Sequence, residues 1–187
     1  MDEMLTVAAS ELILGGQRSG KSRRAESLAA GWLAQSPRYQ AVLIATGQPH
    51  DAEMRERIAH HRRERALRVP RLQSVEEPLQ LAPAIAAHSR PDTLLVVDCL
   101  TLWLTNHLMP AQGSPGQAPL AELLQALRVA PGPVVLVGNE IGLGVIPLGR
   151  EVRHFVDTLG RLNQEVARVC ERVTFMVAGL PLTLKAP

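Results

Sequence analysis

The sequence predicts an α/β fold with a mostly parallel sheet flanked by helices, and two observations support this. Apolar segments of strand length alternate with segments of helical composition along the 187 residues. The apolar segments also lack polar alternation, which is typical of strands buried on both faces. Strands separated by helices favour right-handed βαβ crossovers, which make neighbouring strands parallel. Ligands of such sheets bind at the carboxyl ends of the strands.

The first half of the chain begins with a short apolar strand that runs directly into a glycine-rich turn. Further on, a highly charged helix has Asp51 as a plausible N-cap. The next helix has Pro78 at its start, where proline is favoured, and is rich in Ala and Leu. The expected elements are a strand at 11–14, a helix at 22–33, a strand at 41–45, helices at 51–67 and 78–88, and a strand at 93–97.

The second half of the chain contains the longest irregular stretch, residues 109–119, which we interpret as a surface loop because it holds three Pro and two Gly. A Pro-Gly-Pro breaker precedes the next buried strand. The following helix is long, although Gly160 weakens it. The expected elements are helices at 120–127 and 150–170, strands at 134–137 and 173–177, and an edge strand at 182–184.

Composition narrows the class of protein. The net charge of +2 argues against a general nucleic-acid binder, and an aromatic content of 3% is too low for a base-stacking platform. No apolar run reaches the roughly 18 to 20 residues of a membrane span, and the first ten residues make a poor secretion signal. Two cysteines indicate neither a disulfide framework nor a metal site. We therefore expect one cytoplasmic domain spanning residues 1–187.

The glycine-rich turn after the first strand matches the complete G-x-x-x-x-G-K-[ST] pattern of a P-loop. Its glycines let backbone N–H groups surround phosphate oxygens, Lys21 supplies a positive charge, and the hydroxyl of Ser22 can hold Mg²⁺. The helix that follows points its positive end at the same anion. The alternative is a glycine-rich turn that contains Lys and Ser by chance. The matching residues are Gly15, Gly16, Gln17, Arg18, Ser19, Gly20, Lys21 and Ser22. Together they predict a P-loop NTPase of the RecA-like α/β class.

Enzymes with a P-loop also need an acid at the end of a neighbouring strand to hold the metal. Asp98 follows the apolar strand at 93–97 and fits this role. The simpler interpretation is a strand-terminal Asp that caps the next segment. We predict that Asp98 is a metal or nucleotide ligand.

The charged helix at 51–67 contains two adjacent histidines among its arginines. Such a helix is most simply a solvated one stabilised by i,i+4 ion pairs. At about 100° per residue, however, His61 falls on the same narrow face as Met54 and Ile58, whereas His60 lies about 100° away. A histidine that faces phosphates can act as a general base or as a nucleophile, and flanking arginines would neutralise the phosphate oxygens. We therefore favour His61 for this role, with His60 as the competitor.

Several further segments carry a resemblance to one family. They are Ile44-Ala-Thr-Gly47, Asp51 to Arg63, Val75-Glu-Glu-Pro78, Val97-Asp-Cys-Leu-Thr101, Asn139-Glu140 to Pro147, Arg153-His-Phe155 and Gly160-Arg-Leu-Asn-Gln164. With the P-loop, in this order, they resemble the bifunctional adenosylcobinamide kinase / adenosylcobinamide-phosphate guanylyltransferase family of cobalamin biosynthesis. The resemblance covers nearly the whole chain, from about Leu12 to Leu184.

The resemblance implies two reactions. A nucleoside triphosphate, ATP or GTP, first phosphorylates the aminopropanol hydroxyl of adenosylcobinamide. GTP then guanylylates an enzyme histidine with release of pyrophosphate, and the GMP passes to adenosylcobinamide phosphate to give adenosylcobinamide-GDP. The family's histidine is followed by a basic residue, which places it at His61 before Arg62. The resemblance also implies a homotrimer, and we expect the corrinoid site to lie between subunits.

The resemblance implies the remaining site residues and agrees with the roles already predicted for Ser22 and Asp98. Beside the nucleotide, at the end of the second strand, would lie Ala45, Thr46 and Gly47. The histidine would be followed along the guanylyl group by Arg62, Arg63, Glu64 and Arg65. The nucleotide and metal surroundings would be completed by Glu76, Asp98 and Ser22.

Other functions remain open from the residues themselves. A different small-molecule P-loop kinase would use the same loop but transfer the γ-phosphate directly, with no histidine intermediate. A non-catalytic module that is switched by a nucleotide would instead respond to the γ-phosphate through ordered loops. Asn139 and Glu140 follow a core strand, where catalytic loops belong, but a polar turn is an equal interpretation.

Overall fold

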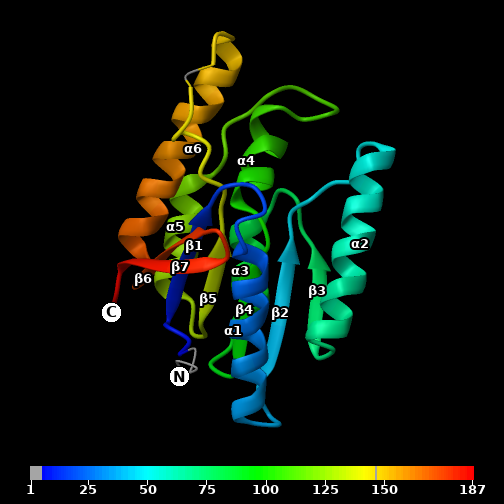
Figure 1. The fold of residues 1–187 in the computed structure, drawn as a ribbon, viewed down its shortest axis with the longest axis vertical. Helices are drawn as coiled ribbons and strands as arrows, with labels where there is room; N and C mark the ends of the chain where they lie inside the picture. Colours follow the sequence, from blue (N-terminus) through cyan, green and yellow to red (C-terminus); the bar gives the residue numbers. More distant parts are fainter. Residues whose placement is uncertain (1–5, 146) are drawn as a thin grey trace.

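The computed structural model describes residues 6–145 and 147–187. Its centre is a seven-stranded sheet in the order β3-β2-β4-β5-β1-β6-β7. Six strands are parallel and β7 pairs with β6 in the antiparallel sense (Figure 1). The strands are β1 Ser10–Gly15, β2 Gln40–Ala45, β3 Leu72–Glu76, β4 Thr93–Val97, β5 Val134–Val137, β6 Arg172–Val177 and β7 Leu180–Lys185. The predicted mostly parallel α/β fold is confirmed.

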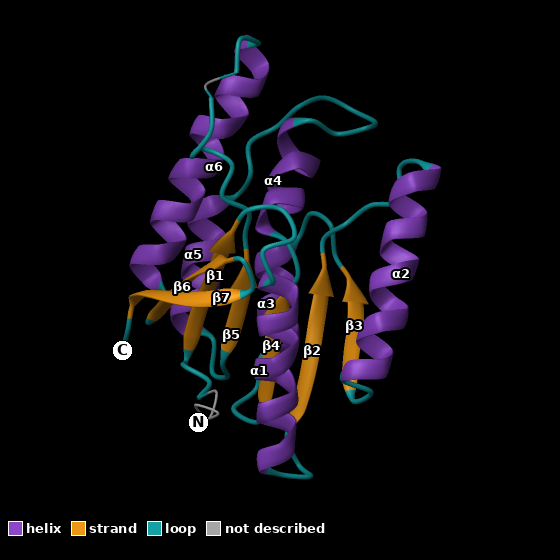
Figure 2. Ribbon diagram, in the orientation of Figure 1, coloured by secondary structure: helices purple, strands orange, loops and turns teal. Residues whose placement is uncertain are grey.

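The helices cover both faces of the sheet (Figure 2). Helices α3, α4, α5 and α6 pack against one face and α1 packs against the other, while α2 lies beside β3 at the sheet edge. Their bounds are α1 Lys21–Gln35, α2 Ala52–Arg68, α3 Leu81–His88, α4 Leu100–Leu108, α5 Leu120–Val129 and α6 Arg150–Val169. Because every parallel strand ends at the same edge, the loops after β1, β2, β4 and β5 gather there.

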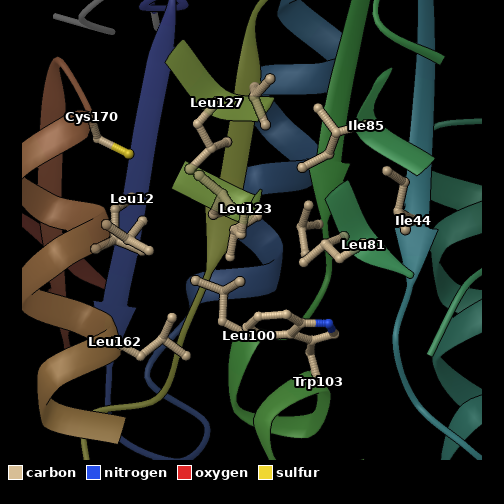
Figure 3. Packing of buried hydrophobic residues seen from close by; sticks show 14 of the residues in the cluster. Leu12, Ile44, Leu81, Ile85, Leu100, Trp103, Leu123, Leu127, Leu162 and Cys170 are labelled. Carbon is tan, nitrogen blue, oxygen red and sulfur yellow. The ribbon is translucent and has the colours of Figure 1, made fainter. Parts of the chain in front are cut away.

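The core on the four-helix side fills the space between α3, α4, α5, α6 and the sheet (Figure 3). Leu12 and Leu136 contribute from neighbouring strands, and Leu123 from α5, each fully buried. Trp103 is also fully buried, and its indole N–H donates to the carbonyl oxygen of Leu79 (2.9 Å). This bond satisfies the one polar group of an otherwise apolar side chain.

Two elements were not predicted from the sequence, and the largest error in a boundary was at the start of one helix. Strand β3 was missed because only Leu72 of its five residues is buried, so it shows no apolar run. Helix α4 was missed because only two residues separate it from the strand that ends at Val97. Helix α3 starts at Leu81 and not at Pro78, since the Glu77 carboxylate accepts the backbone N–H groups of residues 79 and 80 and holds them in a turn.

The remaining expectations agree with the structure. Asp51 is the N-cap of α2 and accepts the backbone N–H of Met54 (2.7 Å). Helix α6 continues through Gly160, and residues 109–119 contain neither helix nor strand. β7 is the edge strand, longer than expected at Leu180–Lys185. Among the described residues, no helix is long and apolar enough to cross a membrane.

Candidate nucleotide site

The P-loop connects β1 to α1 and leaves no room for larger residues at its first glycine. A Cβ on Gly15 would lie 2.6 Å from both the Met176 carbonyl oxygen and the Ser19 Oγ. Gly20 has a φ of 101°, in the region that favours glycine, and α1 begins directly after it. The loop therefore presents the N-terminus of a 15-residue helix to the space above the sheet.

Lys21 lies in this first turn of α1 and is 8% exposed. Its Nζ donates to the carbonyl oxygen of Gly16 (2.6 Å), which folds the side chain back over the loop. Burial lowers the pKa of Lys21, whereas the negative form of Cys99 raises it. Lys21 thus lies close to the end of β4. An anion bound in the loop would attract the ammonium group and so offset the solvation that this group loses on burial.

Asp98 follows β4 and is fixed by the strand next to it. Its Oδ1 accepts the backbone N–H of Thr46 (2.9 Å) and the Thr46 hydroxyl (3.0 Å). The carbonyl oxygen of Thr46 accepts the side-chain N–H of the buried Asn106 on α4 (2.8 Å). Burial raises the pKa of Asp98, and the two Thr46 bonds and the positive charges of Arg65 and His61 oppose that rise. The carboxylate is therefore poorly solvated and lies within electrostatic reach of two side chains of α2, Arg65 and His61.

Helix α2 forms one wall of a groove of about 410 Å³ at the ends of β2 and β3. Arg62 forms an ion pair with Glu76, which is the last residue of β3. Arg65 donates to the Ser74 hydroxyl (3.2 Å). The residues that line the groove are Gly47, Pro49, Arg55, Ile58, Ala59, Arg62, Arg63 and Glu76. The combination of three arginines and one carboxylate suits a ligand that carries both phosphate and N–H donors.

The two histidines of α2 have different surroundings. His60 is exposed and lies 3.7 Å from the Glu64 carboxylate, one turn further along. His61 is also exposed, yet it lies close enough to Asp98 to interact with it electrostatically. His61 therefore lies on the side of α2 that faces the strand ends, although its side chain is not buried there.

The structure brings together most of the residues that the sequence indicated. The P-loop, residues 45–47, Asp98, Glu76 and the arginines at 62, 63 and 65 all lie at one edge of the sheet. Glu64 does not line the groove, because it pairs with Arg68 (3.2 Å) and His60. Ser22 is exposed in the first turn of α1.

The oxygen donors at this edge suit Mg²⁺. The ion prefers hard oxygen ligands and keeps several waters and substrate phosphates in its coordination shell, so few protein ligands are needed. Asp98 keeps its second carboxylate oxygen, since both Thr46 bonds go to Oδ1. The Ser22 hydroxyl is accessible at the mouth of the loop. Among the described residues, no group of three or more His, Cys, Asp or Glu could form a site made of protein alone.

Three contacts that shape this edge were not predicted from the sequence. Gly179, in the β6–β7 turn, donates its backbone N–H to the Ser19 carbonyl oxygen (3.0 Å). Glu140 donates its backbone N–H to the Gly15 carbonyl oxygen (3.1 Å). Asn106 fixes Thr46, as described above. No local pattern could have indicated them, because each contact joins segments distant in the chain.

The fold and this edge define an α/β protein of the P-loop nucleotide-binding class. The comparisons identify the family within that class. Residues 11–184 match the model of the cobinamide kinase / cobinamide phosphate guanyltransferase family, and the chain belongs to this family of enzymes. The predicted family membership is therefore confirmed.

Three curated relatives agree with this assignment. The chain is 49% identical to the bifunctional adenosylcobalamin biosynthesis protein CobP of Pseudomonas aeruginosa, over 94% of the chain and 96% of that protein. It is 35% identical to the bifunctional adenosylcobalamin biosynthesis protein CobU of Escherichia coli, and 36% identical to CobU of Salmonella typhimurium. Both of these matches cover 93% of the chain and 98% of the relative.

Proposed function

We propose that the protein phosphorylates adenosylcobinamide with a nucleoside triphosphate and then transfers GMP from GTP to adenosylcobinamide phosphate through a guanylyl-His61 intermediate. The observation that carries the proposal is the shared edge: the P-loop, Asp98 and the groove along α2 all lie at the carboxyl ends of strands of one sheet. The family description and the names of the relatives support the two activities.

The kinase step is chiefly a matter of position and charge. The backbone N–H groups of the P-loop, Lys21 and the N-terminus of α1 would bind the phosphates and stabilise charge on the transferred group. Asp98 and Ser22 would hold Mg²⁺, which supplies charge neutralisation between the β- and γ-phosphates when bound. The acceptor hydroxyl would form a bond to the γ-phosphorus as the bond to the leaving nucleoside diphosphate breaks.

The guanylyl step uses α2. A neutral imidazole nitrogen of His61 would attack the α-phosphorus, forming an N–P bond while the α–β P–O bond breaks and pyrophosphate leaves. Arg62 and Arg63, which line the groove, would neutralise the α-phosphate oxygens. A phosphate oxygen of the corrinoid substrate would then displace the imidazole. Since His61 is exposed, we expect α2 to move toward the P-loop before the first attack.

We also propose, from the family resemblance, that the protein is a homotrimer, and that the corrinoid site lies between subunits because a corrinoid is large relative to a chain of 187 residues. Light scattering of the active protein tests this directly. A fully active monomer would remove the idea.

The decisive experiment uses GTP labelled at the α-phosphate and, in parallel, GTP labelled at the γ-phosphate. Each is incubated with Mg²⁺, pyrophosphatase and either wild type, His61→Ala or His60→Ala, and the denatured chain is examined for label. We expect an acid-labile, alkali-stable adduct from the α-label alone, absent in His61→Ala and retained in His60→Ala. Loss of the adduct in His60→Ala alone would transfer the role to His60. Absence of an adduct in every sample would favour a simple P-loop kinase.

A further inference from the structure

We propose that Glu140 is the general base of the kinase step, accepting the proton of the acceptor hydroxyl. This inference rests on the proposed function and assigns a residue to one of its two reactions. Glu140 lies in the loop after β5, and β5 pairs directly with the P-loop strand β1. Its backbone N–H donates to the carbonyl oxygen of Gly15, the first residue of the P-loop.

The backbone around Glu140 is fixed from three sides. The N–H of Asn139 donates to the Thr101 hydroxyl on α4 (2.9 Å), and the carbonyl oxygen of Asn139 accepts the side-chain N–H of the buried Asn163 on α6 (3.2 Å). The bond to Gly15 provides the third fixed point. A simple surface turn needs no such support. A catalytic group does, because the reacting atoms must be held to within a fraction of an ångström.

The two other acids proposed for this site, Glu76 and Asp98, have other roles. Glu76 forms an ion pair with Arg62, and Asp98 accepts both hydrogen bonds of Thr46. The half-buried Glu140 carboxylate accepts the backbone N–H of Gly142 (2.7 Å), and a carboxylate can accept further bonds. Glu140 is therefore well suited to meet a hydroxyl group that approaches the P-loop from the β5 side.

This side also suits the acceptor. The loop after Glu140 carries apolar side chains that are almost fully exposed, with Leu143, Val145 and Leu148 at 79%, 97% and 96%. The arginine groove lies at the ends of β2 and β3, and β4 separates these strands from β5. The corrinoid, a large acceptor with extensive apolar surface, would cover the exposed side chains while its hydroxyl reaches the γ-phosphate. The two reactions would then use different parts of one strand edge, the kinase step near the end of β5 and the guanylyl step near the ends of β2 and β3.

The chemistry balances without a further reactant. The hydroxyl oxygen bonds to the γ-phosphorus, its proton passes to the Glu140 carboxylate, and the bond between the γ-phosphorus and the bridging oxygen breaks. The nucleoside diphosphate leaves with that electron pair, and Glu140 later releases the proton to water. A positioned base of this kind contributes about 10²- to 10⁴-fold to a rate.

The test compares Glu140→Gln with Glu140→Ala in full-length protein. Glutamine keeps an oxygen that can accept the Gly142 N–H but removes the basic carboxylate, whereas alanine removes both. Corrinoid phosphorylation is measured under saturating substrate, and labelling of the protein by α-labelled GTP is measured separately. Glu77→Gln is the matched control, because Glu77 is also half-buried and accepts backbone N–H groups in a turn at the same edge.

We expect both Glu140 variants to lose about 10²-fold or more in phosphorylation while labelling by GTP and the control variant stay near wild type. Retention of phosphorylation in Glu140→Gln, with loss only in Glu140→Ala, would make Glu140 a turn residue and overturn the inference. Equal loss of both reactions would also overturn it, since the defect would then lie in the P-loop. Absence of corrinoid phosphorylation in wild type would instead remove the proposed function.

Discussion

The backbone N–H of Gly179 donates to the carbonyl oxygen of Ser19 at 3.0 Å, so the turn between the last two strands supports the P-loop. The contact is close, because a Cβ on Gly20 would lie 3.2 Å from the Cα of Gly179. Gly179 itself has a φ of 83°, a conformation that is unfavourable for other residues. The shape of the phosphate site therefore depends on a segment near the end of the chain.

Gly179→Ala is expected to weaken GTP binding. Alanine at this φ is strained by about 1 to 2 kcal/mol, and relief of the strain would shift the turn and with it the Ser19 carbonyl. If the shifted turn weakens the free energy of GTP binding by about 1.4 kcal/mol, the dissociation constant of GTP rises about tenfold. Titration with a fluorescent GTP analogue measures the change.

Gly113→Ala is the control for that variant. Gly113 has a φ of 89° and open space around it, as Gly179 has, but it lies in the loop at 109–119. Both variants should lose similar thermal stability, and only Gly179→Ala should lose affinity for GTP. Equal affinities in the two variants would show that the turn does not support the P-loop.

Asp98→Asn is expected to stabilise the nucleotide-free protein at neutral pH while impairing catalysis. Burial raises the pKa of Asp98, so the folded chain binds this proton more tightly than the unfolded chain. The resulting stability is present below the unfolded pKa of about 3.9 and is lost as the pH rises through the folded pKa. Asparagine avoids that loss, and its amide oxygen can still accept the bonds of Thr46.

The melting temperature of Asp98→Asn, measured without Mg²⁺ or nucleotide, should exceed that of wild type at pH 7 and converge with it below about pH 4. Mg²⁺-dependent turnover should fall about 10²-fold or more. Asp92→Asn changes an exposed residue just before β4 and should leave both the melting temperature and the turnover unchanged. A lower melting temperature at pH 7 for Asp98→Asn would contradict the burial argument.

Local patterns predicted the parts of this site that are continuous in sequence. Strands β4 and β5 were predicted with their observed bounds because they are short apolar runs between clear breaks. The P-loop was evident because its chemistry lies within eight residues. Strand β3 was not evident from the sequence because it is mostly exposed. Helix α4 was not evident because the loop between β4 and α4 is too short to mark where the helix begins.

Contacts between distant segments were beyond the sequence patterns because they depend on strand order. The Thr46–Asp98 bonds require β2 to pair with β4. The Gly179–Ser19 bond requires β6 to lie beside β1. Helix periodicity predicted that His61 faces the body of the protein, whereas its side chain is exposed in the structure.

Glu11→Ala is expected to destabilise the fold strongly without touching the nucleotide site. Glu11 is fully buried in β1, and its carboxylate pairs with Arg24 (2.9 Å) and Arg172 (3.4 Å) and accepts the Thr174 hydroxyl (2.8 Å). Removing it leaves two poorly exposed guanidinium groups without their partner. Loss of one member of a buried ion pair costs about 3 to 5 kcal/mol.

Urea unfolding measures this change as a difference in the free energy of unfolding. Glu165→Ala removes a glutamate from an exposed ion pair with Arg168 and should change that free energy by less than about 1 kcal/mol. A loss below about 1 kcal/mol for Glu11→Ala would show that the network contributes no more than a surface pair.

Asp51→Ala is expected to impair the guanylyl step more than the kinase step. Asp51 caps α2, which carries His61 and the groove arginines, whereas the P-loop and Asp98 lie on other elements. Loss of an N-cap costs a helix about 1 kcal/mol, so the first turn of α2 should open more often. Amide hydrogen exchange should therefore rise in α2, and labelling of the protein by α-labelled GTP should slow about fivefold, in proportion to the lost helix population. Asp51→Ser keeps a capping oxygen and should restore both toward wild type. Equal slowing of both reactions in Asp51→Ala would indicate that α2 serves the kinase step as well, and the proposed separation of the two reactions between the end of β5 and the ends of β2 and β3 would then be wrong.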